Sequence, residues 1–414
     1  MSFGSTNLQR AFDQSQSTVD ALFKNDYLSY YENTYNNNTV LLSMVKKTKD
    51  FVGKRKEFPA PLSFGGGVGS GRLPEANTAN YGDVYFTAKK MYSVARVERE
   101  SLGASANSKG AFVEAITELV KKVSEADSFN QERAAMGDGT GALGVINTGG
   151  VTDNGSGNYT LIVSATGGTS TTWKEANFEE RMFVNIGTGN TDLFEITAVV
   201  SSTRAITVQR QAGGSKVPTA ADTMYMQGSQ NNDIQGLEGV CLATSGSLYG
   251  VTVGRRWQSQ QILNYGSTIS MAVINRLCLQ QEKATGKAPK YALTSYKQFE
   301  KLINQTEDLK RYPMPSNEKV KGGFKGIDVL TTSGIMTVVP SRFCRDDIFF
   351  ALNPDYITYY QRPNSGFVKE DISANPYGYL RVVDEDQFEL RHATYGELFI
   401  APPFQSVITG LTTA

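Results

Sequence analysis

The feature that most constrains the fold is one long helical pattern, from about Ser108 to Met136. Its apolar side chains form a single narrow stripe at helical spacing, made of Phe112, Ile116, Leu119, Val123 and Ala126. Glu118 and Lys122 form an i,i+4 pair on another side, and Gly137 and Gly139 end the pattern. At about 1.5 Å per residue this helix is about 40 Å long. The narrow stripe predicts a helix that lies across a sheet rather than inside a core.

A long β-hairpin is predicted before this helix, between Gly53 and Leu102. One strand, "KRKEFPAPLSF", leads up to the glycine-rich tip "SFGGGVGSGRLP", and "DVYFTAKKMYSVARVERES" returns with alternating side chains. A two-stranded ribbon by itself is marginal in water and exposes its backbone edges. We therefore expect the hairpin to be ordered by contact with another copy of the chain.

The glycine tip also has to be compared with phosphate-binding loops. Gly66 and Gly71 have the spacing of the G-x-x-x-x-G-K-[ST] motif, but Arg72 and Leu73 stand where the lysine and the hydroxyl side chain belong. The G-x-G-x-x-G pattern fails in every register. The sequence thus predicts a soft hairpin tip and no bound cofactor.

The residues before the hairpin predict an N-terminal arm with two short helices. The first helix is expected over Asn7–Phe23, and the second begins at Thr39 and carries Leu41, Met44, Val45 and Phe51 on one side. Between them the sequence is polar and aromatic. Because apolar residues are sparse here, we expect the arm to lie on a neighbour's surface.

A separate β-rich insert is predicted after the long helix, where the composition changes at Asn147. Glycine-rich turns separate five short strand patterns: Tyr159–Val163, Arg181–Ile186, Leu193–Val200, Arg204–Gln209 and Met224–Met226. This density of short strands predicts a small closed barrel or a sandwich. We place the inserted domain at 151–233.

The remainder, from Leu237, mixes helices and strands in an α+β pattern. Helices are predicted in "STISMAVINRLCLQQEKATG" and "SYKQFEKLINQ". Strands are predicted in "KYALTS", "GIDVLTTSG", "DDIFFALNPDYITYYQRP", "YGYLRVV" and "DQFELRHATYGELFI".

Composition excludes several functional classes. Lysine plus arginine equals aspartate plus glutamate, at 41 each, which argues against a nucleic-acid binder with a basic face. The single histidine, His392, rules out zinc sites built on several histidines, and we interpret it as a structural strand residue. The three cysteines are widely spaced and odd in number, so we expect a reducing origin. There is no signal peptide pattern and no run long enough to span a membrane.

Taken in order, these features resemble the major capsid protein of tailed bacteriophages, which has the Hong Kong ninety-seven-type capsid fold. The stretches "GRRWQSQQI" and "APKYALTSYKQFEKL" are similar to the opening of the family's axial domain and to its strand-then-helix segment. The resemblance covers nearly the whole chain except the insert. It implies an N-terminal arm (1–52), the E-loop hairpin (53–102), a peripheral domain with the spine helix (103–150), an axial domain (234–339), the peripheral sheet and loop (340–397) and a C-terminal axial segment (398–414). The inserted β-barrel domain (151–233) is predicted from its own strand patterns.

The resemblance implies a structural protein that forms hexamers and pentamers of an icosahedral head around double-stranded DNA. It implies a scaffolding protein, a portal at one vertex, non-specific contact with the packaged DNA, no membrane and, as an option, a decoration protein. The location would be the virion, after assembly in the bacterial host's cytoplasm. No catalytic, cofactor or metal residue is predicted. The residues expected to serve assembly are Gly65, Gly66, Gly67, Gly69, Gly71 and Arg72 at the hairpin tip, and Phe112, Ile116, Leu119 and Val123 on the spine helix.

Some family features have no matching motif here, and two alternatives stay open. Lys54, Lys56 and Asn364 are candidates for a covalent cross-link by residue type alone. The acidic run Asp384–Asp386 is interpreted as a turn or an intersubunit salt bridge rather than a metal site. An encapsulin-like compartment shares the fold and would bind a cargo peptide. A β-rich enzyme acting on glycans is the remote alternative, because the composition does not exclude a pair of catalytic carboxylates.

Overall fold

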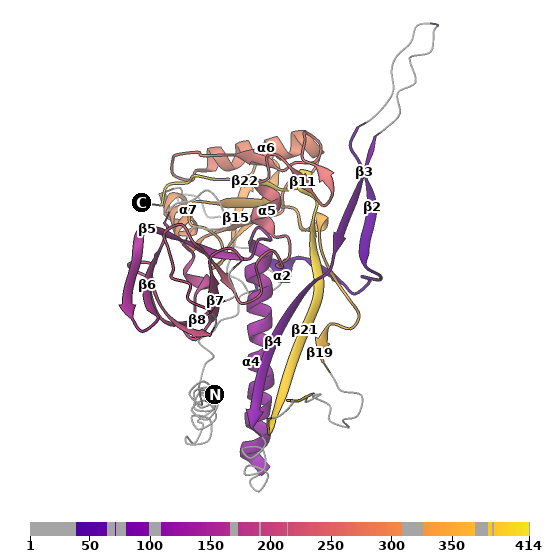
Figure 1. Cartoon of the computed structure of the whole chain (residues 1–414). Helices are drawn as coiled ribbons and strands as arrows, with labels where there is room; N and C mark the ends of the chain where they lie inside the picture. Colours follow the sequence, from indigo (N-terminus) through magenta and orange to yellow (C-terminus); the bar gives the residue numbers. More distant parts are fainter. Residues whose placement is uncertain are drawn as a thin grey trace. The chain divides into compact units, whose positions relative to one another are not determined.

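The computed structural model describes residues 39–63, 71, 80–98, 109–165, 173–189, 192–212, 214–308, 326–368, 380–382 and 385–413. The chain divides into two compact units. Figure 1 shows the path of the chain with its main helices and strands labelled. Unit 1 comprises Met1–Asn37, Lys90–Gln131 and Pro363–Tyr395; unit 2 comprises Asn38–Lys89, Glu132–Arg362 and Gly396–Ala414. In the described part, no helix is both long and apolar enough to cross a bilayer.

Unit 1 places a long helix against a sheet, as the narrow stripe predicts. The helix α4 (Lys109–Met136) confirms the expected one, and its residues up to Gln131 belong to this unit. Strands β4 (Lys89–Glu98), β19 (Gly366–Phe367) and β20 (Leu380–Arg381) all pair with β21 (Gln387–Ile400). Asp127 of α4 accepts a hydrogen bond from Thr394 Oγ1 at 3.0 Å and lies 3.1 Å from Nδ1 of His392, both on β21. These contacts hold α4 to the sheet.

The expected return strand of the hairpin is two strands. It breaks at Ala88 into β3 (Tyr81–Thr87), which pairs with β2 (Arg55–Pro61), and β4, which pairs with β21. Alternation of side chains along a strand does not depend on which strand lies beside it. The periodicity therefore identified extended backbone correctly but missed the change of partner.

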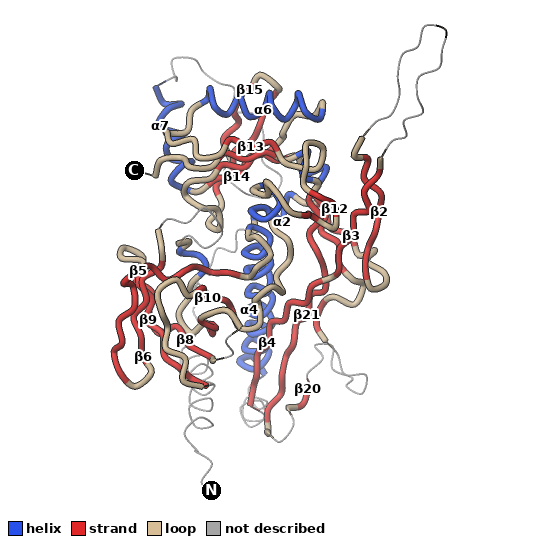
Figure 2. The backbone as a smooth tube through the Cα atoms, turned by 45° about the horizontal axis from the view of Figure 1, so that its top comes forward, coloured by secondary structure: helices blue, strands red, loops and turns tan. Residues whose placement is uncertain are grey.

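Unit 2 contains a closed antiparallel barrel with the strand order β10-β5-β6-β9-β8-β7 (Figure 2). Its strands are β5 (Ala142–Gly155), β6 (Asn158–Val163), β7 (Phe183–Ile186), β8 (Leu193–Val200), β9 (Ala205–Ala212) and β10 (Thr223–Met226). Alternate side chains of β6 point inward, and Leu161, Phe194 and Ile206 are fully buried in the barrel core. Of the two forms expected from the sequence, a closed barrel and a sandwich, the structure therefore contains the closed barrel.

The first barrel strand was missed by the sequence analysis. Strand β5 begins at Ala142 rather than within an insert starting at Val151, and its register shifts between Ile146 and Val151 and again between Asp153 and Gly155. Bulges of this kind interrupt the two-residue period and admit glycine and asparagine. The segment thus has the composition of a linker although it is a strand.

A second six-stranded sheet forms another core of unit 2, in the order β13-β22-β17-β14-β16-β15. Its strands are β13 (Gln260–Ile262), β14 (Tyr291–Thr294), β15 (Ile327–Thr331), β16 (Gly334–Pro340), β17 (Phe349–Leu352) and β22 (Ser406–Ile408). Helix α6 (Met271–Thr285) packs Ile274 and Leu277 into this core, and α7 (Tyr296–Asp308) adds Leu302. Ser270 caps α6 through the amide of Val273, and Gly286 ends the helix in the left-handed region.

Two segments differ from their predicted places. Strand β17 lies between β22 and β14, although the segment Asp346–Pro363 was assigned to the peripheral sheet. The second arm helix, α2 (Val40–Met44), stops before Val45 and is followed by β1 (Lys46–Thr48), parallel to β18 (Ile357–Gln361). Because all three residues Val40–Leu42 are at most 2% exposed, this part of the expected arm is core of unit 2.

Candidate functional site

The base of the hairpin packs on its own unit through aromatic rings. Phe58 of β2 lies edge-on to Phe399 of β21 with ring centroids 4.7 Å apart, and Phe86 of β3 stacks on the same ring at 5.8 Å. Phe86 is 6% exposed. The expectation that the hairpin has little self-burial is therefore wrong for its base. The tip, apart from Ser63 and Gly71, lies outside the described residues.

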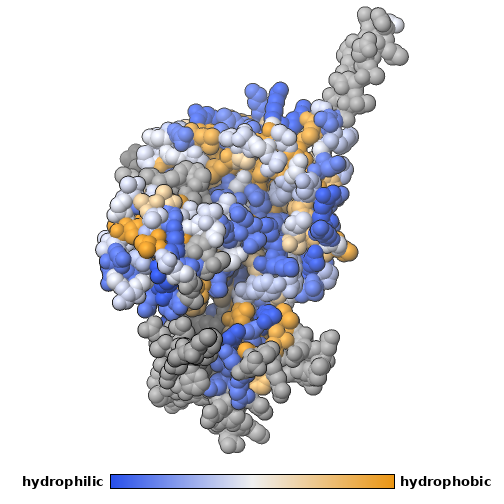
Figure 3. Space-filling view, in the orientation of Figure 1, coloured by the Kyte–Doolittle hydropathy of each residue, from blue (hydrophilic) through white to orange (hydrophobic). Residues whose placement is uncertain are grey.

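The outward face of the same hairpin is polar and aromatic. Tyr81 and Tyr85 are exposed on β3, and the guanidinium of Arg55 lies 4.6 Å from the ring centre of Tyr85. Over the visible surface, hydrophobic groups form small separate areas among hydrophilic ones (Figure 3). The hairpin thus has one face buried against its own unit and one more exposed face, on which Tyr81 is 60% exposed.

A tight turn fixes the hairpin to β21. It joins β11 (Ser247–Leu248) to β12 (Val251–Thr252), and its Tyr249 has a φ of 52°. The carbonyl of Tyr249 accepts from the amide of Tyr85 at 2.9 Å, and its hydroxyl donates to the carbonyl of Leu398 at 2.9 Å. Gly250 also has a positive φ, and a Cβ there would lie 2.1 Å from the Tyr85 ring. Glycine is required at this position on both counts.

A pocket of about 290 Å³ lies beside this turn, within unit 2. Its lining includes Tyr85, Lys89, Asp233, Tyr249 and Glu397. Glu397 is 3% exposed, and its Oε1 accepts from the amide of Gln235 at 2.7 Å. Burial raises the pKa of Glu397 to about 8, because desolvation outweighs the amide bonds and the charge of Lys89.

A second buried carboxylate caps the first described helix. Oε1 and Oε2 of Glu132 accept from the amides of Leu41 and Leu42 at 2.7 and 3.0 Å. These amides have no partner inside a helix, because they belong to the first turn of α2. Glu132 is fully buried, and desolvation raises its pKa to about 7. The carboxylate therefore ties the start of α2 to α4 at the cost of its own hydration.

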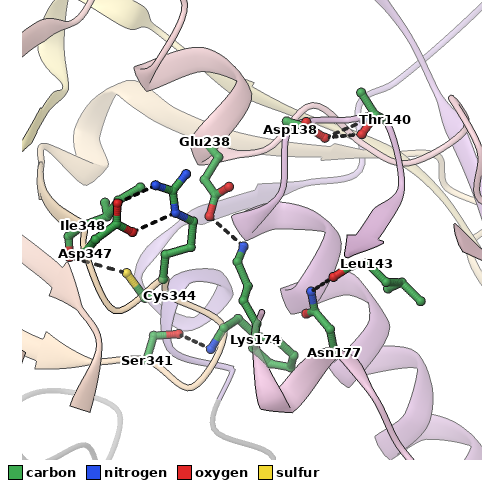
Figure 4. Close-up of polar contacts among 12 residues, drawn as sticks. Asp138, Thr140, Leu143, Lys174, Asn177, Glu238, Ser341, Cys344, Asp347 and Ile348 are labelled. Carbon is green, nitrogen blue, oxygen red and sulfur yellow. Dashed lines mark hydrogen bonds and ion pairs between the residues drawn. The ribbon is translucent and has the colours of Figure 1, made fainter. Parts of the chain in front are cut away.

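A third polar site lies where the connection between β6 and β7 meets α5 (Leu237–Cys241) and the loop between β16 and β17. Nζ of Lys174 lies 2.6 Å from Oε1 of Glu238 on α5, and both side chains are at most 4% exposed (Figure 4). Next to them Arg345 forms a two-pronged ion pair with Asp347 at 2.9 and 2.6 Å. The pKa of Arg345 is raised overall: desolvation by burial acts to lower it, but the hydrogen bonds to Asp347 and the charge of Glu238 outweigh that effect. The two cations and two anions balance inside the protein.

Few of the residues predicted to serve assembly are fully described by the structure. Gly65, Gly66, Gly67, Gly69 and Arg72 lie outside the described residues, while Gly71 has a φ of 92°. Of the four predicted residues on α4, only Val123, 6% exposed, has a described side chain; the side chains of Phe112, Ile116 and Leu119 lie outside the described part. The assembly roles of these residues stay predictions.

The buried carboxylates were not predicted, although two of them left a signal. Glu397 interrupts the apolar run "GELFI", where a strand buried on both faces leaves a charged group no route to water. Glu238 also lies among apolar residues, in "GLEGVCL", whereas Glu132 and Lys174 have polar neighbours in the sequence and carry no comparable signal. Their partners come from segments distant in sequence, so only the fold reveals them.

The described residues offer little for catalysis. Cys241 and Cys278 are buried, and desolvation raises their thiol pKa values to about 12 and about 11, which disfavours the reactive thiolate. His392 lies on β21, as expected, with its Nδ1 3.1 Å from a carboxylate oxygen of Asp127. No group of three metal-binding side chains occurs among the residues described. Glu385 of the acidic run lies 3.5 Å from Arg96 of the same chain, and the salt bridge between subunits expected there stays a prediction.

Comparison with known proteins identifies the fold. No family model and no curated protein matches the sequence. Among solved structures, the capsid asymmetric unit of cyanophage A-1(L) superposes with a TM-score of 0.55 at 12% identity, over 95% of this chain and 98% of that chain. The capsid of cyanophage P-SCSP1u gives 0.45 at 9% identity over 94% and 93%, and the empty GTA particle capsid 0.44 at 8% over 96% and 98%. The match with the cyanophage A-1(L) capsid supports the conclusion by itself. It confirms the resemblance predicted from the sequence, because it shows that the chain has the fold of a phage capsid subunit.

Proposed function

We propose that this chain is the major capsid protein of a tailed phage, forming hexamers and pentamers of an icosahedral shell around double-stranded DNA. The observation that supports this most is the match with the cyanophage capsid subunit along almost the full length of both chains. A binding module grafted on another fold would match over one part only. The protein is then structural rather than enzymatic.

The proposal extends to partners and to the barrel. A separate scaffolding protein, a portal at one vertex and, as an option, a decoration protein would contact the shell. A net charge of zero suits non-specific contact with packaged DNA without tight binding. The barrel would lie on the outer surface, where extra volume disturbs the lattice least.

Electron microscopy of the purified protein tests the proposal. We expect closed shells, or rings of five and six subunits, when the subunit is produced alone or together with the scaffolding protein of its own phage. A triple variant of Gly66, Gly67 and Gly69 to valine should fold but assemble poorly, because we expect the tip to make no contact with the core. A protein that stays monomeric in both preparations would contradict the proposal. Shells that exclude DNA and enclose a protein cargo would favour the encapsulin-like alternative.

A further inference from the structure

The pocket at the base of the hairpin contains a cation without an ion-pair partner. Lys89 is half-buried and lines the pocket, and its Nζ donates one hydrogen bond to the carbonyl of Asn231 at 2.8 Å. Within the described part of the chain, no carboxylate lies at ion-pair distance from this ammonium group. Two of its three N–H groups thus remain available to a guest.

The other charged groups around the pocket are already balanced. Asp233 lies 3.1 Å from Arg133, and both side chains are less than a tenth exposed. The hydroxyl of Tyr249 is bonded to β21. Glu397 faces Lys89, Asp233 and Tyr249, and because its pKa is raised to about 8 it is largely protonated at neutral pH. The pocket therefore has a net charge of about +1, from Lys89, and presents an additional O–H donor.

The walls suit a small organic group. Tyr85, Phe86 and Leu248 supply apolar surface, and the glycine at position 250 brings the backbone close without a side chain. The volume of about 290 Å³ is near the lower end of ligand pockets. It has room for a group the size of one amino-acid side chain rather than a nucleotide.

We propose that this pocket binds a carboxylate group, held by the ammonium of Lys89 and the carboxyl O–H of Glu397, with its organic part against Tyr85 and Leu248. Charge complementarity selects an anion, and the donors select an acceptor with two oxygens. The carboxylate comes either from a small free acid or from an aspartate or glutamate side chain of a neighbouring copy. The second source rests on the proposed function.

Calorimetric titration of the isolated subunit with propionate tests the binding. Lys89→Met should weaken it about ten-fold, the loss expected for one charge-assisted hydrogen bond. Lys297→Met is the matched control, because Lys297 is exposed and paired with Asp346 elsewhere in unit 2. Between pH 7 and pH 9 the affinity should fall about ten-fold as Glu397 loses its proton. Glu397→Gln should keep binding and remove this pH dependence.

Three results would overturn the proposal: no binding of propionate, equal binding by Lys89→Met, or preferential binding of methylammonium. Titration of assembled particles then separates the two sources. Particles that still take up propionate indicate a free acid. Particles that exclude it, while the isolated subunit binds, indicate a neighbour's carboxylate in the pocket. The subunit measurement holds whether or not the chain forms a capsid.

Discussion

Replacing Lys174 by methionine should destabilise the barrel by about 3 kcal/mol. The lysine and its partner Glu238 are both almost fully buried, and removal of one member of such a pair typically costs about 3–5 kcal/mol, because the other charge stays in a low-dielectric interior. We take the lower end, because the charge of Arg345 still acts on Glu238. The double variant Lys174→Met/Glu238→Leu should recover most of the loss, since no unpaired charge then remains.

Urea unfolding followed by the fluorescence of Trp173 measures this effect. Trp173 stacks on Phe178 with ring centroids 5.3 Å apart and packs against the barrel core, next to the substituted residue. A Trp257→Phe background makes it the only tryptophan. The matched control is Lys216→Met, whose partner Asp222 is also on the barrel but is partly exposed; we expect about 0.2–1 kcal/mol there. Equal losses for the two lysines, or no recovery in the double variant, would refute the reasoning.

Three further predictions concern the buried carboxylate on α4, the turn and the barrel. Glu132 has a folded-state pKa of about 7 against an ordinary value of 4.5, so its carboxyl group lowers the free energy of unfolding by about 3 kcal/mol as pH rises from about 4.5 to 7. In Glu132→Gln, denaturant titrations should show a correspondingly smaller difference in the free energy of unfolding between pH 5 and pH 8. A difference equal to that of the unmodified protein would contradict the assignment. Gly250→Ala should push the ring of Tyr85 away and raise amide exchange in β3, whereas Gly246→Ala, which has open space around it, should not. Excision of 142–226 removes Lys174 and leaves Glu238 buried without this partner, so it should give a stable subunit only when Glu238 is also replaced by leucine. Identical melting temperatures with and without the Glu238→Leu replacement would count against the role of the ion pair.

Several elements could be predicted because their signal is local. The stripe of α4, the serine and glycine caps of α6 and the alternation in β6 each follow from side chains a few residues apart. Repeats of this kind bury one face of an element whatever lies against it. The order of these elements was enough to indicate the capsid fold, although no single motif identifies it.

The tertiary structure alone decided which strands pair and which polar groups are buried. The partners of β4, β5 and β17 depend on hydrogen bonds between segments far apart in sequence, and alternation is the same for any partner. The raised pKa values of Glu132 and Glu397 arise because packing removes water from both carboxylates. Desolvation depends on everything that surrounds a group in three dimensions, so local sequence cannot express it.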